Sequence, residues 1–554
     1  MRLSRYISVL CAALLFVMTA RAVQIRREPG HRLPEYILPT DRDNPMLWSD
    51  NSSSILTRAA VPGVYANNDI PRTGTIEYPL ILVDFIDCPF TLRDTLALLE
   101  RYEKMFNEQG YTDTIGFIHN GVRYYGATGS VSDYFRDQSY GQYVPKFKII
   151  GPVHPSKGYA YYGKGTKDDN INMLVREICR LVIENGLADL SGYARNGTID
   201  QLSIIYAGRG ENYDGADVNT IWPQASYLDI DNRNEPAIYK SGIRKIKFAC
   251  SCELFWDSDS IPDGIGTFCH EFSHTLGLPD FYNTSSESES ITDASMGYWS
   301  IMDYGIYENG GFSPVGYTAF EKYSLGWMDI EEIDYSGYYY LNEIGTKPQP
   351  EAGIHSAYRL NTGLDDQFII LENHNGTGWY KYQACQGLMV TAVNYDNNRW
   401  VGNNVNNQKN NKRYAILPAD NDYDRNTNSG DLFPYKDIDS ITTLGTPVLK
   451  AGTSYPLYSI YDIKLENGLV SFHARPDIHS AVESHPDQEI SISVTDGELS
   501  VTAPTGSSLT VFDISGKAIL HTLTTEPRQL ISLPGKGIWI VKCGNKVRKL
   551  RIEN

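Results

Sequence analysis

The chain has 554 residues, 41% hydrophobic and 21% charged, which suits three or four folded units of ordinary soluble composition. Its formal net charge of −18 argues against a nucleic-acid-binding surface, because a protein that neutralises phosphates needs a basic face. No apolar stretch reaches the ~20 residues of a membrane-spanning helix, so we expect no stable membrane span.

The N-terminus has the pattern of a secretory signal peptide. Two arginines precede an apolar run that ends at Met18, and small residues lead up to Ala22. We predict that residues 1–22 are removed and that the product is secreted. Residues 23–75 are rich in Arg, Pro, Asn and Ser and lack sustained periodicity, so they are predicted to form a pro-region.

A catalytic domain is predicted over residues 76–330. The continuous apolar run at residues 78–85 indicates a buried strand, and apolar residues at helical spacing predict a helix over 171–182. Residues 202–208 and 243–248 are predicted to be further strands. Because the last of these alternates between apolar and charged residues, we expect a half-exposed edge strand. An ordinary edge strand is the favoured interpretation, and a strand that pairs with an extended peptide is the alternative.

The chemistry is predicted to lie on a helix that ends near Gly277. Its residues His270 and His274 are four apart, so both imidazoles project from one helical face and can bind one zinc ion. Glu271 follows the first histidine. There it can act as general base toward a water molecule and then as general acid toward the leaving amine.

The residues after this helix extend the metal motif. Gly277 allows a sharp turn, and Asp280 can then return to the metal as a third ligand. The segment 300–305 follows at the distance where metzincin peptidases place a methionine turn. In such a turn Met302 forms an apolar floor beneath the metal, and Tyr304 can hydrogen-bond the oxyanion.

Together these segments resemble the immune-inhibitor-A-like family of zinc metallopeptidases over most of residues 76–475. The resemblance implies extracellular proteolysis of protein or peptide substrates by a zinc enzyme made with a pro-segment. The family often has an acidic residue where Asn283 stands, so Glu287 and Glu289 remain alternative third ligands. The family resemblance rests on Leu80-Ile81-Leu82-Val83-Asp84-Phe85, Gly129-Ser130-Val131-Ser132-Asp133-Tyr134-Phe135, Trp299-Ser300-Ile301-Met302, Ala319-Phe320-Glu321-Lys322 and the run from His270 to Asp280.

A β-rich domain is predicted over residues 331–475, where short Tyr-, Val- and Ile-rich segments alternate with polar loops. Asp420, Asp422, Asp424, Asn426, Asn428 and Asp431 place oxygen ligands at nearly alternate positions, which makes calcium a second candidate metal. Arg425 stands where a calcium loop has its turn glycine, so a solvated polar loop is the alternative. Trp400 to Asn407 is typical of the same family and has no evident catalytic role.

A small C-terminal β-sandwich is predicted over residues 488–554, after a polar linker with two prolines. The runs 511–517 and 537–542 look like the C-terminal sorting domain of type IX secretion cargo. This resemblance implies export across an outer membrane through a secretion machinery, followed by release or attachment to the cell surface. A plain accessory sandwich is the alternative.

The predicted fold is therefore an α+β, metzincin-like catalytic domain with a mixed sheet and an active-site helix, followed by the two β modules. The predicted activity is zinc-dependent endopeptidase, with Glu271 and Tyr304 as catalytic residues and His270, His274 and Asp280 as ligands. One alternative is a catalytically silent surface-binding protein of the same fold. Another is a zinc enzyme that takes a distant glutamate as third ligand, which the methionine turn speaks against.

Overall fold

The computed structural model describes residues 70–552 except 113–115, 164–168, 214–218, 286–294, 365, 409–410, 425, 427, 443–455, 477–489, 496–497, 504–506 and 544–545. The predicted signal peptide, nearly all of the predicted pro-region, and the alternative ligands Glu287 and Glu289 lie outside the described residues. Among the helices of the described part, none is both long and apolar enough to cross a membrane.

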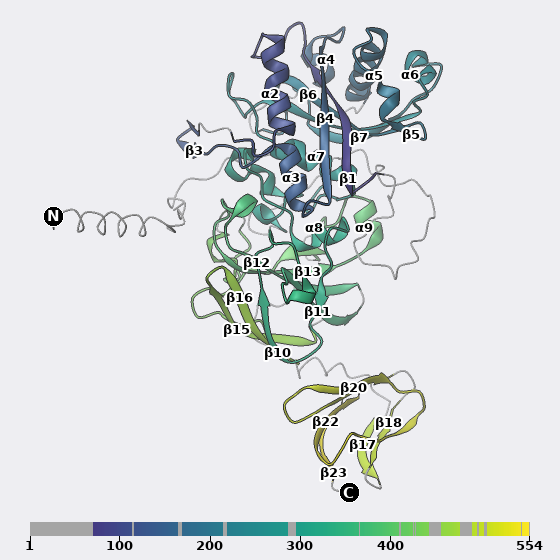
Figure 1. Ribbon diagram of the computed structural model, residues 1–554, viewed down its shortest axis with the longest axis vertical. Coiled ribbons are helices and arrows are strands. Elements are labelled where there is room, and N and C mark those ends of the chain that lie inside the picture. Colours follow the sequence, from purple (N-terminus) through teal and green to yellow (C-terminus); the bar gives the residue numbers. More distant parts are fainter. Residues whose placement is uncertain are drawn as a thin grey trace, which may run out of the picture. The chain divides into compact units, whose positions relative to one another are not determined.

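A mixed six-stranded sheet is the framework of the predicted catalytic domain (Figure 1). β1 is buried from Tyr78 to its end, as expected for a parallel strand covered on both faces. Four strands are parallel, and the last strand in the spatial order is antiparallel to its neighbour. In that order the strands are β4 (Tyr143–Val153), β1 (Gly74–Val83), β6 (Thr198–Arg209), β8 (Lys245–Leu254) and β7 (Gln224–Asp229), with β5 (Ala194–Arg195) paired to β6.

The edge strand predicted at residues 243–248 is wrong, because β8 lies between β6 and β7. Lys247 suggested a solvent-facing position, yet it is only 5% exposed. It pairs in register with Tyr227 of β7, and the Lys245 ammonium lies 4.8 Å from the centre of the Tyr227 ring. β7 therefore occupies the sheet edge at which the sequence placed β8.

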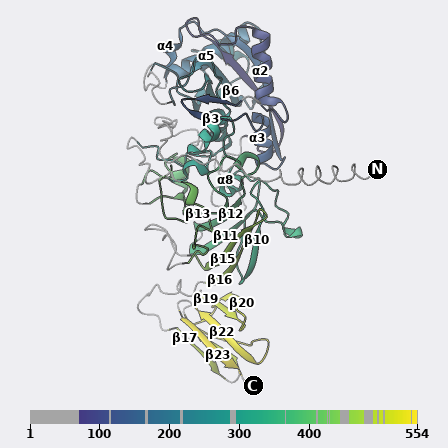
Figure 2. The same cartoon turned by 90° about the vertical axis from the view of Figure 1, so that its left-hand side faces the viewer.

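Two long helices connect the parallel strands, α2 (Thr95–Asn107) between β1 and β4 and α5 (Asp169–Glu184) between β4 and β6. The two crossovers run in opposite directions along the sheet, so their usual right-handedness places the helices on opposite faces. Figures 1 and 2 show this arrangement. The helix predicted at 171–182 is confirmed. Shorter elements are α3 (Val131–Gln138), α4 (Tyr159–Gly163), α6 (Pro236–Lys240), α8 (Ala319–Ser324) and the hairpin β2 (Phe117–His119) with β3 (Val122–Tyr124).

The predicted active-site helix is α7 (Gly266–Leu276), and every one of its residues is buried. Phe268 and Phe272 anchor it to the aromatic core, where each ring lies 5.8 Å from Phe147 of β4. The helix ends at Gly277, which has φ +116°, a conformation that glycine adopts without strain. The opposite face of α7 is thereby left for the histidines.

The β-rich part contains two sheets with one common core, as its alternating apolar pattern predicts. Leu371 and Val390 of the larger sheet and Phe472 of the smaller one belong to this core. The larger sheet has the order β14 (Tyr414–Ile416), β13 (Gly387–Asn394), β12 (Gln367–His374), β11 (Ala357–Leu364) and β9 (Glu331–Glu332), and the smaller one β10 (Gly337–Leu341), β16 (Leu469–Pro476) and β15 (Tyr458–Glu466).

The β-rich part and the catalytic part share buried contacts. The Phe281 ring lies 4.7 Å from the ring of Tyr414 in β14, and Phe320 of α8 lies 4.8 Å from the same ring. The Trp299 indole donates to the buried Asp431 carboxylate across 2.6 Å. The loops of the β-rich part therefore pack directly on the segments that follow α7.

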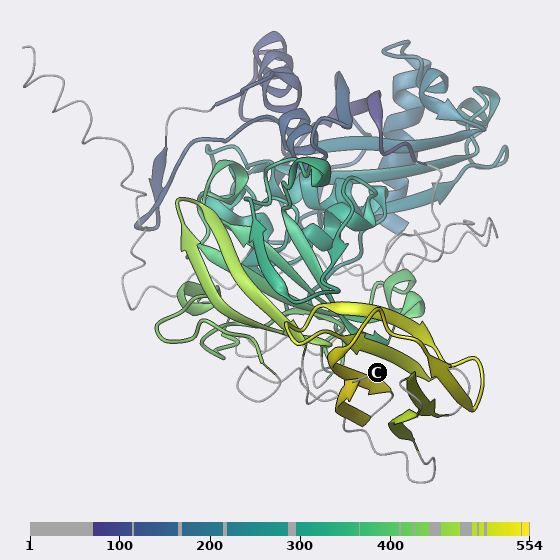
Figure 3. The same cartoon turned by 60° about the horizontal axis from the view of Figure 1, so that its bottom comes forward.

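The C-terminal segment, yellow in Figure 3, contains two antiparallel sheets that share one core. Leu499 and Val501 of one sheet and Val511 and Val541 of the other are fully buried in it. The strands are β17 (Ser491–Thr495), β18 (Glu498–Thr502) and β21 (Arg528–Ile531), then β20 (Ala518–Leu523), β19 (Ser508–Phe512), β22 (Gly537–Cys543) and β23 (Lys546–Ile552).

Candidate metal centre

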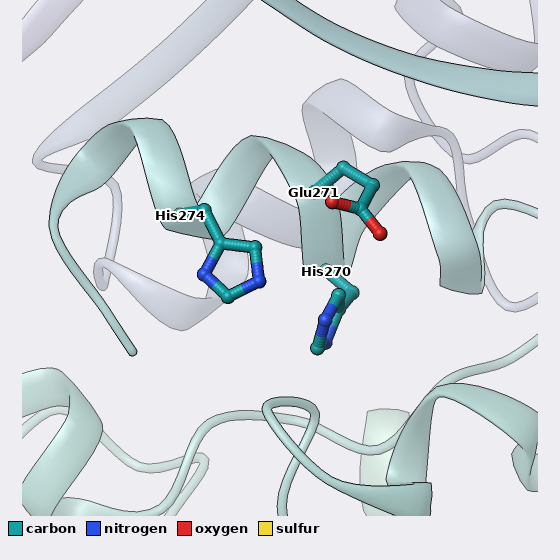
Figure 4. A group of neighbouring side chains, drawn as sticks. All are labelled: His270, Glu271 and His274. Atoms are coloured by element: carbon teal, nitrogen blue, oxygen red, sulfur yellow. The ribbon is translucent and has the colours of Figure 1, made fainter. Parts of the chain in front are cut away.

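The two predicted histidine ligands lie together on α7. His270 and His274 are 0% and 2% exposed, and their ring centres are 4.7 Å apart at an interplanar angle of 82°. Figure 4 shows both imidazoles on the same side of the helix, with Glu271 next to His270. The single-face arrangement expected from the four-residue spacing is present.

Backbone carbonyls fix the protonation of both rings. His270 Nδ1 lies 2.7 Å from the carbonyl oxygen of Ile301, and His274 Nδ1 lies 2.8 Å from that of Leu278. A carbonyl oxygen only accepts, so Nδ1 is the protonated nitrogen in each ring and donates. The Nε2 lone pairs are then available to a metal, in the arrangement typical of zinc-binding histidines.

Asp280, the predicted third ligand, lies next to both histidines. Its Oδ1 atom lies 3.2 Å from His270 Nε2 and 3.3 Å from His274 Nε2. Zinc bonds of roughly 2.0–2.1 Å in tetrahedral directions separate neighbouring ligand atoms by about 3.3 Å, which agrees with both distances. Glu271 also comes within 4.8 Å of the histidines. The short distances to both rings are those expected of the predicted third ligand Asp280, and Glu271 is the residue predicted to act as general base.

The charges of these groups suit a divalent cation. Burial lowers the pKa of His270, which favours the neutral ring. Burial alone raises the pKa of Asp280, but protonated His274 and His270 bring it well below its usual range, which shows that a positive charge between the three side chains favours the carboxylate. Within the described part of the chain, His270 Nε2 and Asp280 Oδ1 have no hydrogen-bond partner. Two buried atoms that each have a free electron pair and no hydrogen-bond partner are suited to bind a metal ion.

The segment predicted as a methionine turn supports the centre through its backbone. Its Ile301 carbonyl holds His270, and Phe281 N donates to the Met302 carbonyl over 2.8 Å. Ser300 Oγ accepts from Met302 N at 3.0 Å. The turn thus fixes His270 and also Phe281, the residue next to Asp280.

The side-chain roles predicted for this turn remain predictions. Met302 is fully buried, which suits an apolar floor. Tyr304 begins the 3-10 helix η4 (Tyr304–Gly311), is 8% exposed, and lies with its ring 6.0 Å from Tyr298 and 6.4 Å from Tyr307. These contacts place it in an aromatic group.

Sequence reasoning missed Asn403. Its amide makes two hydrogen bonds with Asp280, although the residues are 123 positions apart. The available signal was the polar run Gly402 to Asn407, in which four of six residues are asparagine. Composition marks such a run as a loop and gives no hint of what it contacts.

Comparisons with known proteins agree with this centre. Residues 77–330 match the model of the immune inhibitor A peptidase M6 catalytic domain. The pre-pro-metalloprotease PrtV of Vibrio cholerae serotype O1 is 26% identical over 327 residues, covering 51% of this chain and 33% of PrtV. Immune inhibitor A of Bacillus thuringiensis subsp. alesti is 26% identical over 280 residues, covering 45% of this chain and 36% of that protein.

The chain therefore spans about a third of the length of these relatives. The bounds of the match are close to those of the predicted catalytic domain. The match contains α7 with both histidines and, after the helix, Asp280. Residues 77–330 are thus similar to the catalytic domain of peptidase M6 proteins, and the metalloprotease relative and the residues of the site are consistent with a metallopeptidase.

Proposed function

We propose that this protein is a zinc-dependent endopeptidase that hydrolyses peptide bonds in protein substrates. The observation that carries the proposal is the position of Asp280 Oδ1, which lies 3.2 and 3.3 Å from the two histidine Nε2 atoms. Two neutral imidazoles and one carboxylate are a donor set of catalytic zinc sites, which keep a fourth position open. When bound, zinc supplies the Lewis acidity that makes water a nucleophile at neutral pH.

Glu271 is proposed to move the protons. It is 1% exposed and follows the first ligand on α7, and its carboxylate comes within 4.8 Å of the histidine donors. From there it takes a proton from the attacking water and gives it to the leaving amine. Tyr304 is proposed to hydrogen-bond the oxyanion. The position of residues 300–305 after α7, where metzincin peptidases have their methionine turn, supports the proposed metzincin-like character of the domain.

Secretion is proposed from the N-terminal pattern of residues 1–22 and from the sorting-domain resemblance of residues 488–554. The name of one relative, pre-pro-metalloprotease, describes a protein made with segments before the mature enzyme. Intact-mass analysis of the protein from cells that express the full chain tests the first segment: loss of residues 1–22 supports export, and a retained N-terminus contradicts it.

Calcium is proposed as a second, structural metal at the loop that begins at Asp420. Asp420 and Asp422 each accept from the backbone N–H two residues further on, both at 3.0 Å. Asp431 and Asn428 line a small pocket with this loop, and each has a buried Oδ1 atom without a hydrogen-bond partner among the described residues. Burial raises the pKa of Asp431 to about 7, because a buried carboxylate is unfavourable. A bound cation would offset this unfavourable burial of charge.

One experiment tests both metals. The mature protein is expected to cleave denatured casein, to stop in 1,10-phenanthroline, which binds transition metals, and to recover when zinc is added. Dialysis against the chelator EGTA, followed by removal of EGTA and return of zinc alone, is expected to lower the thermal midpoint while cleavage below that midpoint continues. Cleavage that persists in phenanthroline contradicts the zinc proposal, and a midpoint unchanged by EGTA contradicts the calcium proposal.

A further inference from the structure

We propose that Asn403 is a positioning residue for the metal, and that the centre is completed by the β-rich part of the chain. The inference rests on the proposed function, because it takes Asp280 as a ligand. Asn403 Nδ2 donates to Asp280 Oδ2 across 2.7 Å, and Asp280 N donates to Asn403 Oδ1 across 2.7 Å. Asn403 is 5% exposed and Asp280 is 0% exposed, so water does not compete for these bonds.

The bond to Oδ2 decides where Oδ1 points. The two oxygens of a carboxylate are fixed relative to each other, so holding one of them orients the other. In Asp280, Oδ2 accepts from Asn403 and Oδ1 faces both histidine Nε2 atoms. Outer partners that orient a ligand in this way contribute to metal affinity.

An amide is suited to this place because it supplies a donor and an acceptor without a charge. A lysine or arginine would neutralise the carboxylate and weaken its attraction for the metal. An aspartate would place a second negative charge against Asp280. The backbone adds a further requirement, since Asn403 has φ +49°, a left-handed conformation in which asparagine is several-fold enriched.

Neighbouring asparagines hold the loop Gly402–Asn407 against the segment after the ligand. Asn406 Nδ2 lies 2.7 Å from the carbonyl oxygens of both Phe281 and Tyr414, to which it donates. Asn407 Oδ1 accepts from Thr284 N at 2.8 Å. Trp400, fully buried, anchors α9 (Asn397–Val401) just before the loop. Among the described asparagines of this loop, Asn403 is the one that hydrogen-bonds the ligand carboxylate, so the others serve as controls.

The test uses the full mature chain and the variants Asn403→Ala, Asn403→Asp and Asn407→Ala. Zinc affinity is measured by competition with a chromophoric chelator, and the ligand field is read from the visible spectrum of the cobalt-substituted protein. Both Asn403 variants are expected to bind zinc roughly 10- to 100-fold more weakly and to show an altered cobalt spectrum. Asn407→Ala removes the same kind of side chain from the same loop, but Thr284 Oγ1 still donates to the Asn403 carbonyl at 2.8 Å and keeps the loop in contact. This variant is expected to match the wild type in zinc affinity and in the cobalt spectrum.

Asn403→Asp keeps the shape of the side chain and its preference for the left-handed backbone. It is therefore the variant to measure if Asn403→Ala is too unstable to purify. Wild-type zinc affinity and an unchanged cobalt spectrum in a folded Asn403 variant would overturn the inference. An equal loss in Asn407→Ala would also overturn it, because the effect would then belong to the loop. If the wild type itself binds no zinc, the proposed function fails instead, which separates the two outcomes.

Discussion

Replacing Glu271 with glutamine is expected to leave zinc binding intact and to reduce kcat/KM by roughly 10²- to 10⁴-fold, the usual contribution of a general acid–base. The side chain is nearly fully buried beside His270, and the replacement keeps its size while removing its capacity to accept a proton. The measurement pairs cleavage of a quenched fluorescent peptide with metal analysis of the same sample.

Glu103→Gln is the matched control, because Glu103 is an exposed residue of α2 and the same chemical change there leaves the site untouched. It is expected to retain wild-type cleavage. A Glu271→Gln protein that cleaves at the wild-type rate would remove Glu271 from the mechanism. A variant that had lost its zinc would instead assign Glu271 to the metal ligands.

Replacing His274 with alanine is expected to remove both zinc and activity. The ring is one of three donors, and its loss leaves two ligands around a cation that zinc sites normally hold with three or four. The Leu278 carbonyl also loses its hydrogen-bond donor. Metal analysis after dialysis is expected to find well under one zinc per chain, against about one in the wild type.

His154→Ala is the control for this change. His154 lies on the surface with 67% of its side chain exposed and pairs with Asp84 at 2.6 Å. Exposed pairs of this kind contribute little to stability, so the control is expected to keep its zinc and its activity. Full zinc occupancy in folded His274→Ala would mean that the metal is held elsewhere.

The part of the centre that could be predicted from sequence is the part that is local in the chain. His270 and His274 share a face because a helix repeats every 3.6 residues, and Asp280 returns to them because Gly277 ends that helix in a left-handed turn. The sheet was partly predictable for a similar reason. A continuous apolar run such as residues 78–85 has few alternatives to a buried strand.

What could not be predicted depends on pairing between distant segments. β8 looked like an edge strand because its lysines alternate with apolar residues, and only the pairing with β7 shows that it lies inside the sheet. Asn403 carries no local pattern that distinguishes it from the other asparagines of its loop. Its contact with Asp280 follows from the packing of the β-rich part on the segment after α7, to which Tyr414 and Phe281 contribute.

The most direct test of the account is anomalous diffraction at the zinc absorption edge, from crystals of the wild-type protein grown with zinc. The account predicts one strong peak at bonding distance from His270 Nε2, His274 Nε2 and Asp280 Oδ1. A centre without a peak, or a peak held by other side chains with these three turned away, would contradict it.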